Sequence, residues 1–262
     1  MKTIGAQKIN YANNEEMTTA FDPIDYLEEN YTGPDQEDKF TAEFMTEANK
    51  KLDTAPLVLE FGGGPSLLTV ATYAELAREI HFSDFVPNSL NEVQRWLNKD
   101  PGAFSWRNRI KRILIAEDKF PTDDLIDVRE NDIRSKITKL VVGDATLEKP
   151  IGETSVMYDY INAHHCLDVA ATNFDEWCQV MKNIASLLKP KGWLVISITT
   201  GTTTYTVGDM KFRCCNLSQD DVRDGFKQAG FDLDTMLIDS IKIPAKIGRE
   251  YNGMTMAMVQ KK

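Results

Sequence analysis

Apolar and polar positions along the chain alternate between two kinds of segment. Short apolar runs rich in Val, Ile, Leu and Phe are typical of buried parallel strands, and longer stretches of helix-forming residues separate them. Five such runs lie at residues 57–61, 79–85, 139–145, 154–162 and 192–197. This alternation predicts an α/β fold built on a doubly wound, mostly parallel sheet.

The segment before the first apolar run, residues 15–52, has a helical pattern. Gly33-Pro34 divides it into two helical parts. Because these helices precede the first strand, they can fold over the strand ends as a lid. A chain of 262 residues can bury one large core. We therefore predict a helical lid at residues 1–52 and one compact unit at residues 53–262.

The segment from 107 to 138 is highly charged. Four basic residues come early in it and five acidic residues follow. This pattern predicts a solvated, partly helical insertion before the third strand, with no role in chemistry.

The overall charge argues against several classes of partner. Forty acidic against thirty basic residues give a net charge of −10, which disfavours nucleic acid. The four cysteines lack Cys-x-x-Cys spacing, so we predict no metal site. No apolar run approaches the roughly 20 residues that span a bilayer, and no signal peptide is evident. We expect a cytoplasmic protein that acts on a small molecule without a membrane partner, and the oligomeric state stays open.

The first apolar run ends in the most informative motif. Leu-Val-Leu-Glu-Phe-Gly-Gly-Gly-Pro carries Glu60 near its end and passes into Gly62 and Gly64. Glycines let the backbone approach a nucleotide-like ligand, because a Cβ would collide with it. Asp84 ends the second run and Asp144 the third. Since parallel strands end on one edge of a sheet, Asp84 is placed to accept hydrogen bonds from ribose hydroxyls.

This series resembles class I S-adenosylmethionine (SAM)-dependent methyltransferases. Further runs at 231–243 and 254–260 fit the antiparallel pair that closes that fold. The resemblance implies a Rossmann-like, seven-stranded sheet under an N-terminal helical lid, with SAM as cofactor. A dehydrogenase would more often carry a Gly-x-Gly-x-x-Gly turn, whereas Ser66 and Leu67 follow Gly64-Pro65 here, so NAD is the lesser alternative.

Four segments resemble more narrowly the family of nicotinamide, phenylethanolamine and thioether methyltransferases. They are residues 21–31, 104–106, 166–168 and 207–212. Together with the sheet pattern, the resemblance covers residues 21–260. It implies a small-molecule N-methyltransferase.

The resemblance also implies which residues bind SAM. Asp84 and Asp144 would hold the ribose hydroxyls and the adenine amino group, and tyrosine hydroxyls would meet the methionine carboxylate. Two positions depart from the family: Ser89 replaces a ribose-binding Asn, and Leu68 replaces a tyrosine. The implied set is Tyr26, Tyr31, Glu60, Gly62, Gly64, Asp84, Asn88, Ser89, Asp144, Ala145 and His164.

The acceptor site should lie at the end of the fourth strand and after the fifth. We predict His164, Asp168 and Tyr205 as catalytic residues, and Thr202, Tyr205 and Cys214 as contacts of the acceptor. In nicotinamide methyltransferases an Asp and two Ser recognise the carboxamide. Those positions are Ile198, Thr202 and Cys214 here. Without a carboxylate partner, nicotinamide is a poor expectation.

His164 and His165 are two of only three histidines. One of two adjacent histidines at a strand end should point inward and the other outward. The inward one, His164, could act as a base or order the acceptor. Asp168 could engage a substrate amine, or instead cap the helix that begins near Asn173.

Three functions remain open from the sequence. The first is SAM-dependent methylation of a nitrogen in a small amine or N-heterocycle. The second is cyclisation or cleavage of SAM itself, with release of methylthioadenosine, as in formation of azetidine-2-carboxylate. The third is non-catalytic SAM binding.

Overall fold

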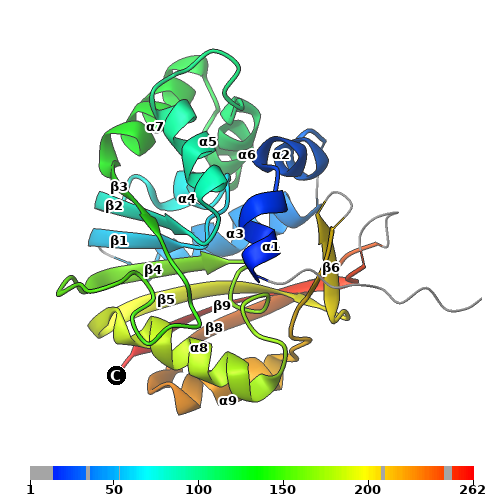
Figure 1. The fold of residues 1–262 in the computed structure, drawn as a ribbon. Coiled ribbons are helices and arrows are strands. Elements are labelled where there is room, and N and C mark those ends of the chain that lie inside the picture. Colours follow the sequence, from blue (N-terminus) through cyan, green and yellow to red (C-terminus); the bar gives the residue numbers. More distant parts are fainter. Residues whose placement is uncertain (1–13, 34–35, 53, 208–209, 245–249) are drawn as a thin grey trace, which may run out of the picture.

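A single sheet of seven strands forms the centre of the molecule (Figure 1). The computed structural model describes residues 14–33, 36–52, 54–207, 210–244 and 250–262. The strands are β1 (Ala55–Phe61), β2 (Ala77–Asp84), β3 (Ile137–Val142), β4 (Tyr158–His164), β5 (Leu188–Thr200), β8 (Phe231–Lys242) and β9 (Gly253–Lys261), and the pair β6 (Thr204–Val207) and β7 (Met210–Arg213) forms a separate hairpin.

Helices connect and cover the strands. They are α1 (Asn14–Ala20), α2 (Pro23–Tyr31), α3 (Gln36–Asn49), α4 (Val70–Tyr73), α5 (Pro87–Leu97), α6 (Arg107–Ala116), α7 (Asp123–Lys136), α8 (Phe174–Ser186) and α9 (Gln219–Gln228). Asp22 separates α1 from α2, because its carboxylate caps α2 by accepting from the backbone N–H groups of Ile24 and Asp25.

The strand order is β3-β2-β1-β4-β5-β9-β8, with β9 antiparallel to both of its neighbours. From β1 the chain runs outward through β2 and β3, then returns to place β4 on the other side of β1. The carboxyl ends of β1 and β4 therefore flank a topological switch point, where open α/β sheets bind ligands. The predicted doubly wound, seven-stranded fold is confirmed.

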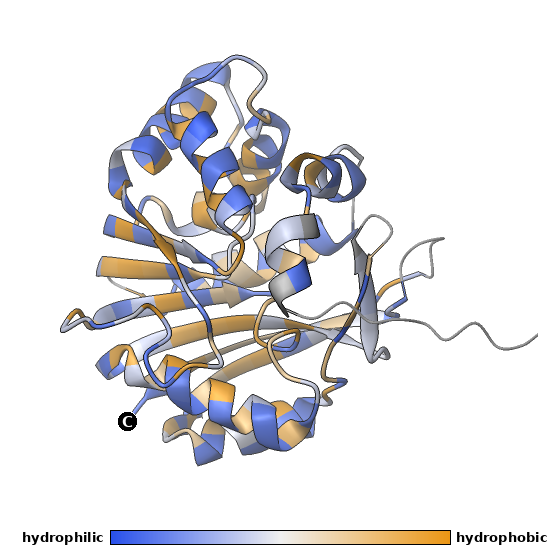
Figure 2. Cartoon of the chain, in the orientation of Figure 1, coloured by the Kyte–Doolittle hydropathy of each residue, from blue (hydrophilic) through white to orange (hydrophobic). Residues whose placement is uncertain are grey.

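Successive side chains of each strand point to opposite faces of the sheet, and this divides the core into two layers. On β5, Val195 faces the core under α2–α7, whereas Leu194, Ile196 and Ile198 face the core under α8 and α9. Figure 2 shows that hydrophobic colour concentrates on the strands and that the covering helices mix hydrophilic and hydrophobic residues. No helix of the described part of the chain is long and apolar enough to cross a bilayer.

Element boundaries differ from the predicted ones by a few residues. β4 begins at Tyr158 rather than near 154, and β5 starts already at Leu188. Residues of α3 such as Phe44 and Met45 are buried in the same core as the sheet. The division of the chain at residue 52 stays a prediction.

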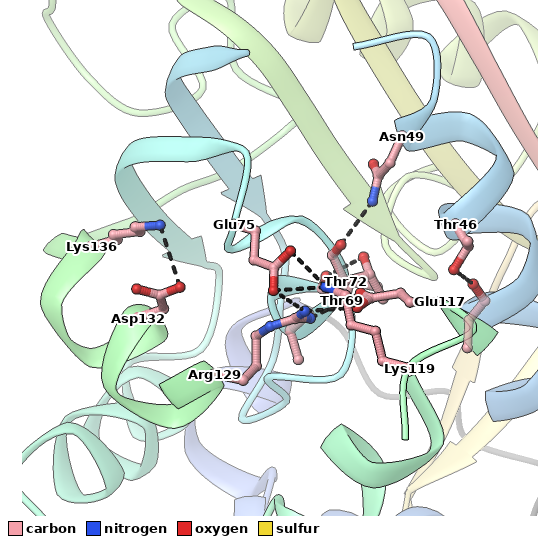
Figure 3. A network of polar contacts seen from close by, with 12 residues as sticks. Thr46, Asn49, Thr69, Thr72, Glu75, Glu117, Lys119, Arg129, Asp132 and Lys136 are labelled. Atoms are coloured by element: carbon pink, nitrogen blue, oxygen red, sulfur yellow. Dashed lines mark hydrogen bonds and ion pairs between the residues drawn. The ribbon is translucent and has the colours of Figure 1, made fainter. Parts of the chain in front are cut away.

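The charged segment from 107 to 138 is not simply solvated, as its composition had suggested. α6 and α7 bury Ile110, Ile113 and Ile133. The Arg129 side chain is only 2% exposed, and it donates to Glu75, to Glu117 and to the carbonyl of Ala71 (Figure 3). This network fastens α7 to α4 and to the turn that follows α4. It therefore supports the segment that begins just after the glycine turn.

Candidate active site

A cavity of about 250 Å³ is lined by the carboxyl ends of β1, β2 and β4 and by residues of α1 and α2. The structure brings ten of the eleven residues predicted for SAM into its lining, together with Tyr205. The ten are Tyr26, Tyr31, Glu60, Gly62, Gly64, Asp84, Ser89, Asp144, Ala145 and His164, and His164 was also predicted as a catalytic residue. The strand-end pattern and the family resemblance together thus identified many of the residues that line this cavity.

The glycine turn after β1 needs its glycines for two different reasons. Gly62 and Gly64 have φ angles of +65° and +60°, a region that other residues rarely adopt. A Cβ at Gly62 would lie 2.5 Å from the Cβ of Cys166. A Cβ at Gly64 would meet no protein atom within 4 Å and would enter the cavity. The first glycine allows close packing, and the second leaves space for a ligand.

Asp84 joins the end of β2 to this turn. Its Oδ2 accepts from the Gly64 N–H at 2.7 Å, and its Oδ1 accepts from the Val86 N–H at 2.8 Å. Burial raises the pKa of Asp84 to about 6, and the hydrogen bonds from the Val86 and Gly64 N–H groups partly offset that rise. The carboxylate thus lies at the ligand edge with lone pairs left for hydroxyl donors.

Glu60 is the centre of a buried polar cluster below the turn. Its carboxylate accepts from the hydroxyls of Thr69 (2.8 Å) and Tyr73 (2.5 Å), and from the amide of Asn162 (2.9 Å to each oxygen). Burial raises the pKa of Glu60 to about 7 in spite of these donors. The carboxylate is therefore held in place by three side chains that the sequence did not identify.

The charged residues of the cavity lining are acidic. They are Glu37, Asp38, Glu60, Asp84 and Asp144, and none of the described lining residues is Lys or Arg. Asp38 pairs with Arg109 at 2.7 Å, whereas Glu60 and Asp84 have no cationic partner among the described residues. Two carboxyl groups buried without a countercharge fit a cationic ligand, and a sulfonium nucleoside is one. The residues present therefore fit SAM.

Aromatic side chains close the cavity from above. Tyr26 lies between Phe21 and Tyr31, with ring centroids 5.4 and 6.1 Å away. Tyr205, on β6, stacks on Phe212 at 5.1 Å. Burial raises the pKa of Tyr26 to about 12, so its hydroxyl stays a neutral donor. These rings would exclude water from a bound ligand.

Both histidines at the end of β4, His164 and His165, line the cavity, so the expectation that one points outward is wrong. The reason is backbone conformation: His164 is the last residue of β4, and His165 turns into the left-handed region at φ +51°. The strand alternation therefore ends between them, and the two rings lie 4.3 Å apart. His164 Nδ1 lies 2.7 Å from the hydroxyl of Ser197 on β5. Burial lowers the pKa of His164 well below its usual value, so the ring is neutral.

Four predicted site residues lie outside the cavity lining: Asn88, Asp168, Thr202 and Cys214. Asp168 is fully buried and accepts from the N–H and hydroxyl of Thr199, both at 2.9 Å. Burial raises the pKa of Asp168 to about 6. It does not cap the next helix, because Asn173 does so. Its placement is that of a residue which orients Thr199.

The other three positions lie beside the cavity. Thr202 donates to the carbonyl of Thr204, and buried Cys214 lies against the carbonyl of Thr202. Asn88 is exposed on α5. Their roles stay predictions that the cavity geometry does not support.

Thr199 and Cys166 line the cavity and lie in the two segments expected to supply the acceptor site, but neither was assigned a role of its own. Tyr251 also lines the cavity and was missed, and Ile198, expected beside the acceptor, faces the opposite core instead. The contacts of Asn162 and Ser197 were not predicted either; both are polar residues inside apolar strands, and this break in the pattern is the signal that could have identified them. Among the described residues, no group of three or more His, Cys, Asp or Glu side chains is arranged to hold a metal ion.

Comparisons with known proteins agree with this geometry. The model of the NNMT/PNMT/TEMT family matches residues 8–262. Indolethylamine N-methyltransferase of Oryctolagus cuniculus is 27% identical, over 87% of this chain and 88% of its own length. Nicotinamide N-methyltransferase of Homo sapiens is 28% identical, over 68% and 67%. Magnesium protoporphyrin IX methyltransferase of Synechocystis, solved with bound SAM, has a TM-score of 0.56 at 12% identity, over 96% of this chain and 100% of its own, and shows the fold. The chain therefore belongs to the NNMT/PNMT/TEMT family of SAM-dependent methyltransferases.

Proposed function

We propose that this enzyme methylates a nitrogen atom of a small amine or N-heterocycle, and that nicotinamide is not its substrate. The observation that carries the proposal is the acidic cavity at the switch point, whose lining combines the predicted SAM-binding residues with His164, Thr199 and Tyr205. When bound, SAM supplies an electrophilic methyl group on its sulfonium. A cavity without Lys or Arg among its described lining residues suits an uncharged amine better than an acid.

The chain's own residues act by positioning. The Gly64 turn and Asp84 hold the nucleoside, and Glu60 supplies negative charge beneath the turn. In-line displacement then depends on distance and alignment, which the aromatic lid of Tyr26 and Tyr205 preserves by excluding water. The acceptor nitrogen must be unprotonated, because a protonated amine has no lone pair to attack with.

Two observations argue against nicotinamide. The position at which nicotinamide methyltransferases place an Asp is Ile198, fully buried in the core under α8 and α9. The side chains of Thr202 and Cys214 lie outside the cavity lining. A carboxamide there would lose its hydrogen-bond partners, a cost of about 1–3 kcal/mol for each group left unpaired.

The purified protein should convert SAM only when an acceptor is present. We expect S-adenosylhomocysteine to form with members of a panel of small amines and N-heterocycles, and no nucleoside product with SAM alone. Liquid chromatography of the nucleosides measures both. Methylthioadenosine formed from SAM alone would contradict the proposal and indicate attack by SAM's own amine. Tight SAM binding without either product would indicate a non-catalytic protein.

SAM binding should release protons near neutral pH. The pKa of Asp84 is raised to about 6 and that of Glu60 to about 7, and a cationic occupant favours the ionised form of both. Affinity should therefore rise with pH up to about pH 7, by up to about tenfold per unit for each proton released, and should level off above that pH. The stability of the unliganded protein changes with pH in the opposite direction. These carboxyls bind more protons in the folded than in the unfolded state, so the free energy of unfolding falls as pH rises from about 4 to 7.

Calorimetry in two buffers of different ionisation enthalpy counts the released protons. His164 adds nothing in this range, because its depressed pKa keeps it neutral. Glu60→Gln should remove the part of the pH dependence of SAM affinity that lies near pH 7, because that part comes from Glu60. Equal binding enthalpies in both buffers at pH 6.5 would show that neither carboxyl titrates on binding.

A further inference from the structure

Ser197 is a buried polar residue inside the apolar strand β5, and its hydroxyl contacts two consecutive residues of the neighbouring strand end. The side chain is fully buried. Its Oγ lies 2.9 Å from the backbone nitrogen of His165 and 2.7 Å from Nδ1 of His164. β4 and β5 pair directly at this point, with His164 opposite Ser197. The contact is therefore set by the sheet register rather than by a loop.

The protons of this contact can be assigned. The His165 N–H can only donate, and both the carbonyl oxygen (3.1 Å) and the Oγ (2.9 Å) of Ser197 accept from it. The hydroxyl has one proton of its own, and among the described residues the recorded partner left for it is His164 Nδ1. The assignment that gives the hydroxyl proton a partner makes Nδ1 the unprotonated nitrogen. A neutral imidazole carries its single proton on the other nitrogen, Nε2.

We propose that Ser197 is a positioning residue that holds His164 in the Nε2–H form, and that this N–H donates a hydrogen bond to the methyl acceptor. The inference rests on the proposed function and narrows its substrate class. The acceptor molecule carries, besides the nitrogen that is methylated, a second heteroatom with a free lone pair, such as a carbonyl, a hydroxyl or a ring nitrogen.

Three observations support the donor role. His164 lines the cavity, whereas its Nδ1 is engaged on the neighbouring strand. No hydrogen bond to Nε2 is recorded from the described part of the chain, and a donor in such a site binds best to a ligand that satisfies it. With its lone pair on Nδ1 already occupied by Ser197, the ring has no free lone pair to take a proton from the substrate. His164 therefore does not serve as the base that the sequence suggested.

The tautomer can be measured without any substrate. The chain has three histidines, so ¹⁵N-histidine NMR gives three pairs of ring nitrogens, which His164→Gln and His165→Gln assign. In the intact protein His164 should be neutral with its proton on Nε2. Ser197→Ala should give a mixture of both tautomers. Ser83→Ala is the matched control, because it removes a fully buried hydroxyl from β2 outside the cavity lining, and it should leave the His164 signals unchanged. A proton on Nδ1 in the intact protein would overturn the inference.

Kinetics on the amines that the panel identifies test the substrate class. His164→Leu should lower kcat/KM by about tenfold, His164→Gln should recover part of the loss because its amide can donate from a similar reach, and SAM affinity should change less than twofold in both. The loss should vanish for matched amines that lack the second heteroatom. Equal losses for both kinds of amine would refute the donor contact. A pH profile of kcat/KM that loses a limb in His164→Gln would show a base instead.

The two proposals fail in different experiments. If no amine is methylated, the proposed function fails, while the NMR result still decides the Ser197–His164 tautomer. If amines are methylated and the tautomer is Nδ1–H, the function stands and the donor role does not.

Discussion

Asp84→Asn is expected to weaken SAM binding by roughly ten- to hundredfold while the protein stays folded. A hydrogen bond to a charged group contributes about 1.5–3 kcal/mol, and the substitution removes the charge that faces the ribose. It also places an amide NH₂ against one of two N–H donors, those of Gly64 and Val86. Two donors repel, so the glycine turn shifts as well.

The fold should tolerate this change. Because burial raises the pKa of Asp84 to about 6, ionising it costs more free energy in the folded, unliganded protein than in the unfolded chain, and a neutral amide avoids that cost. Calorimetry measures affinity and thermal unfolding measures stability. Asp239→Asn removes the same charge from an exposed position on β8 and serves as the control. Unchanged SAM affinity in Asp84→Asn, with the control also unchanged, would refute the ribose role.

The strand-end residues were predictable because they obey a local rule. Gly62, Gly64, Asp84 and Asp144 each follow an apolar run, and parallel strands bring such positions to one edge whatever lies between them. No long-range contact had to be known. The donor half of the cavity therefore follows from pattern and spacing.

The acceptor half depends on contacts between distant segments. Asn162 reaches Glu60 across 102 positions, and Ser197 reaches His164 across 33. Neither pairing has a local signal beyond a polar residue in an apolar strand. Strand register decides which residues of β5 face the cavity. Because side chains alternate, Thr199 faces the cavity and Ile198 faces the opposite core. A shift of one residue in the register would exchange the two.

The prediction that residues 107–138 are solvated was also wrong because it depended on contacts with distant segments. Arg129 lies in a segment dense in charge, which usually indicates a solvated surface. Its partners Glu75 and Glu117 come from outside α7. Their ion pairs and hydrogen bonds offset the free-energy cost of removing the guanidinium from water. A long side chain can also bury its apolar stem while its charged end is paired. Composition cannot report such pairing.

Gly64→Ala is expected to weaken SAM binding at least tenfold (about 1.4 kcal/mol) with only a small loss of stability. The new Cβ meets no protein atom within 4 Å, so the protein bears backbone strain alone, about 1–2 kcal/mol for φ +60°. The same methyl group occupies the cavity at the point where backbone must approach the ligand. The loss therefore falls on binding rather than on folding.

Two other glycines separate strain from occlusion. Gly152→Ala has the same kind of strain, with φ +77° and open space around its Cβ, but lies outside the cavity lining, so it should lose similar stability and no affinity. Gly62→Ala adds a clash with Cys166 and should unfold at the lowest temperature of the three. Thermal unfolding and calorimetry on all three variants test this order. Equal SAM affinity in the Gly64 and Gly152 variants would mean that the ligand does not lie against the glycine turn, and the placement of the donor in this cavity would have to be abandoned.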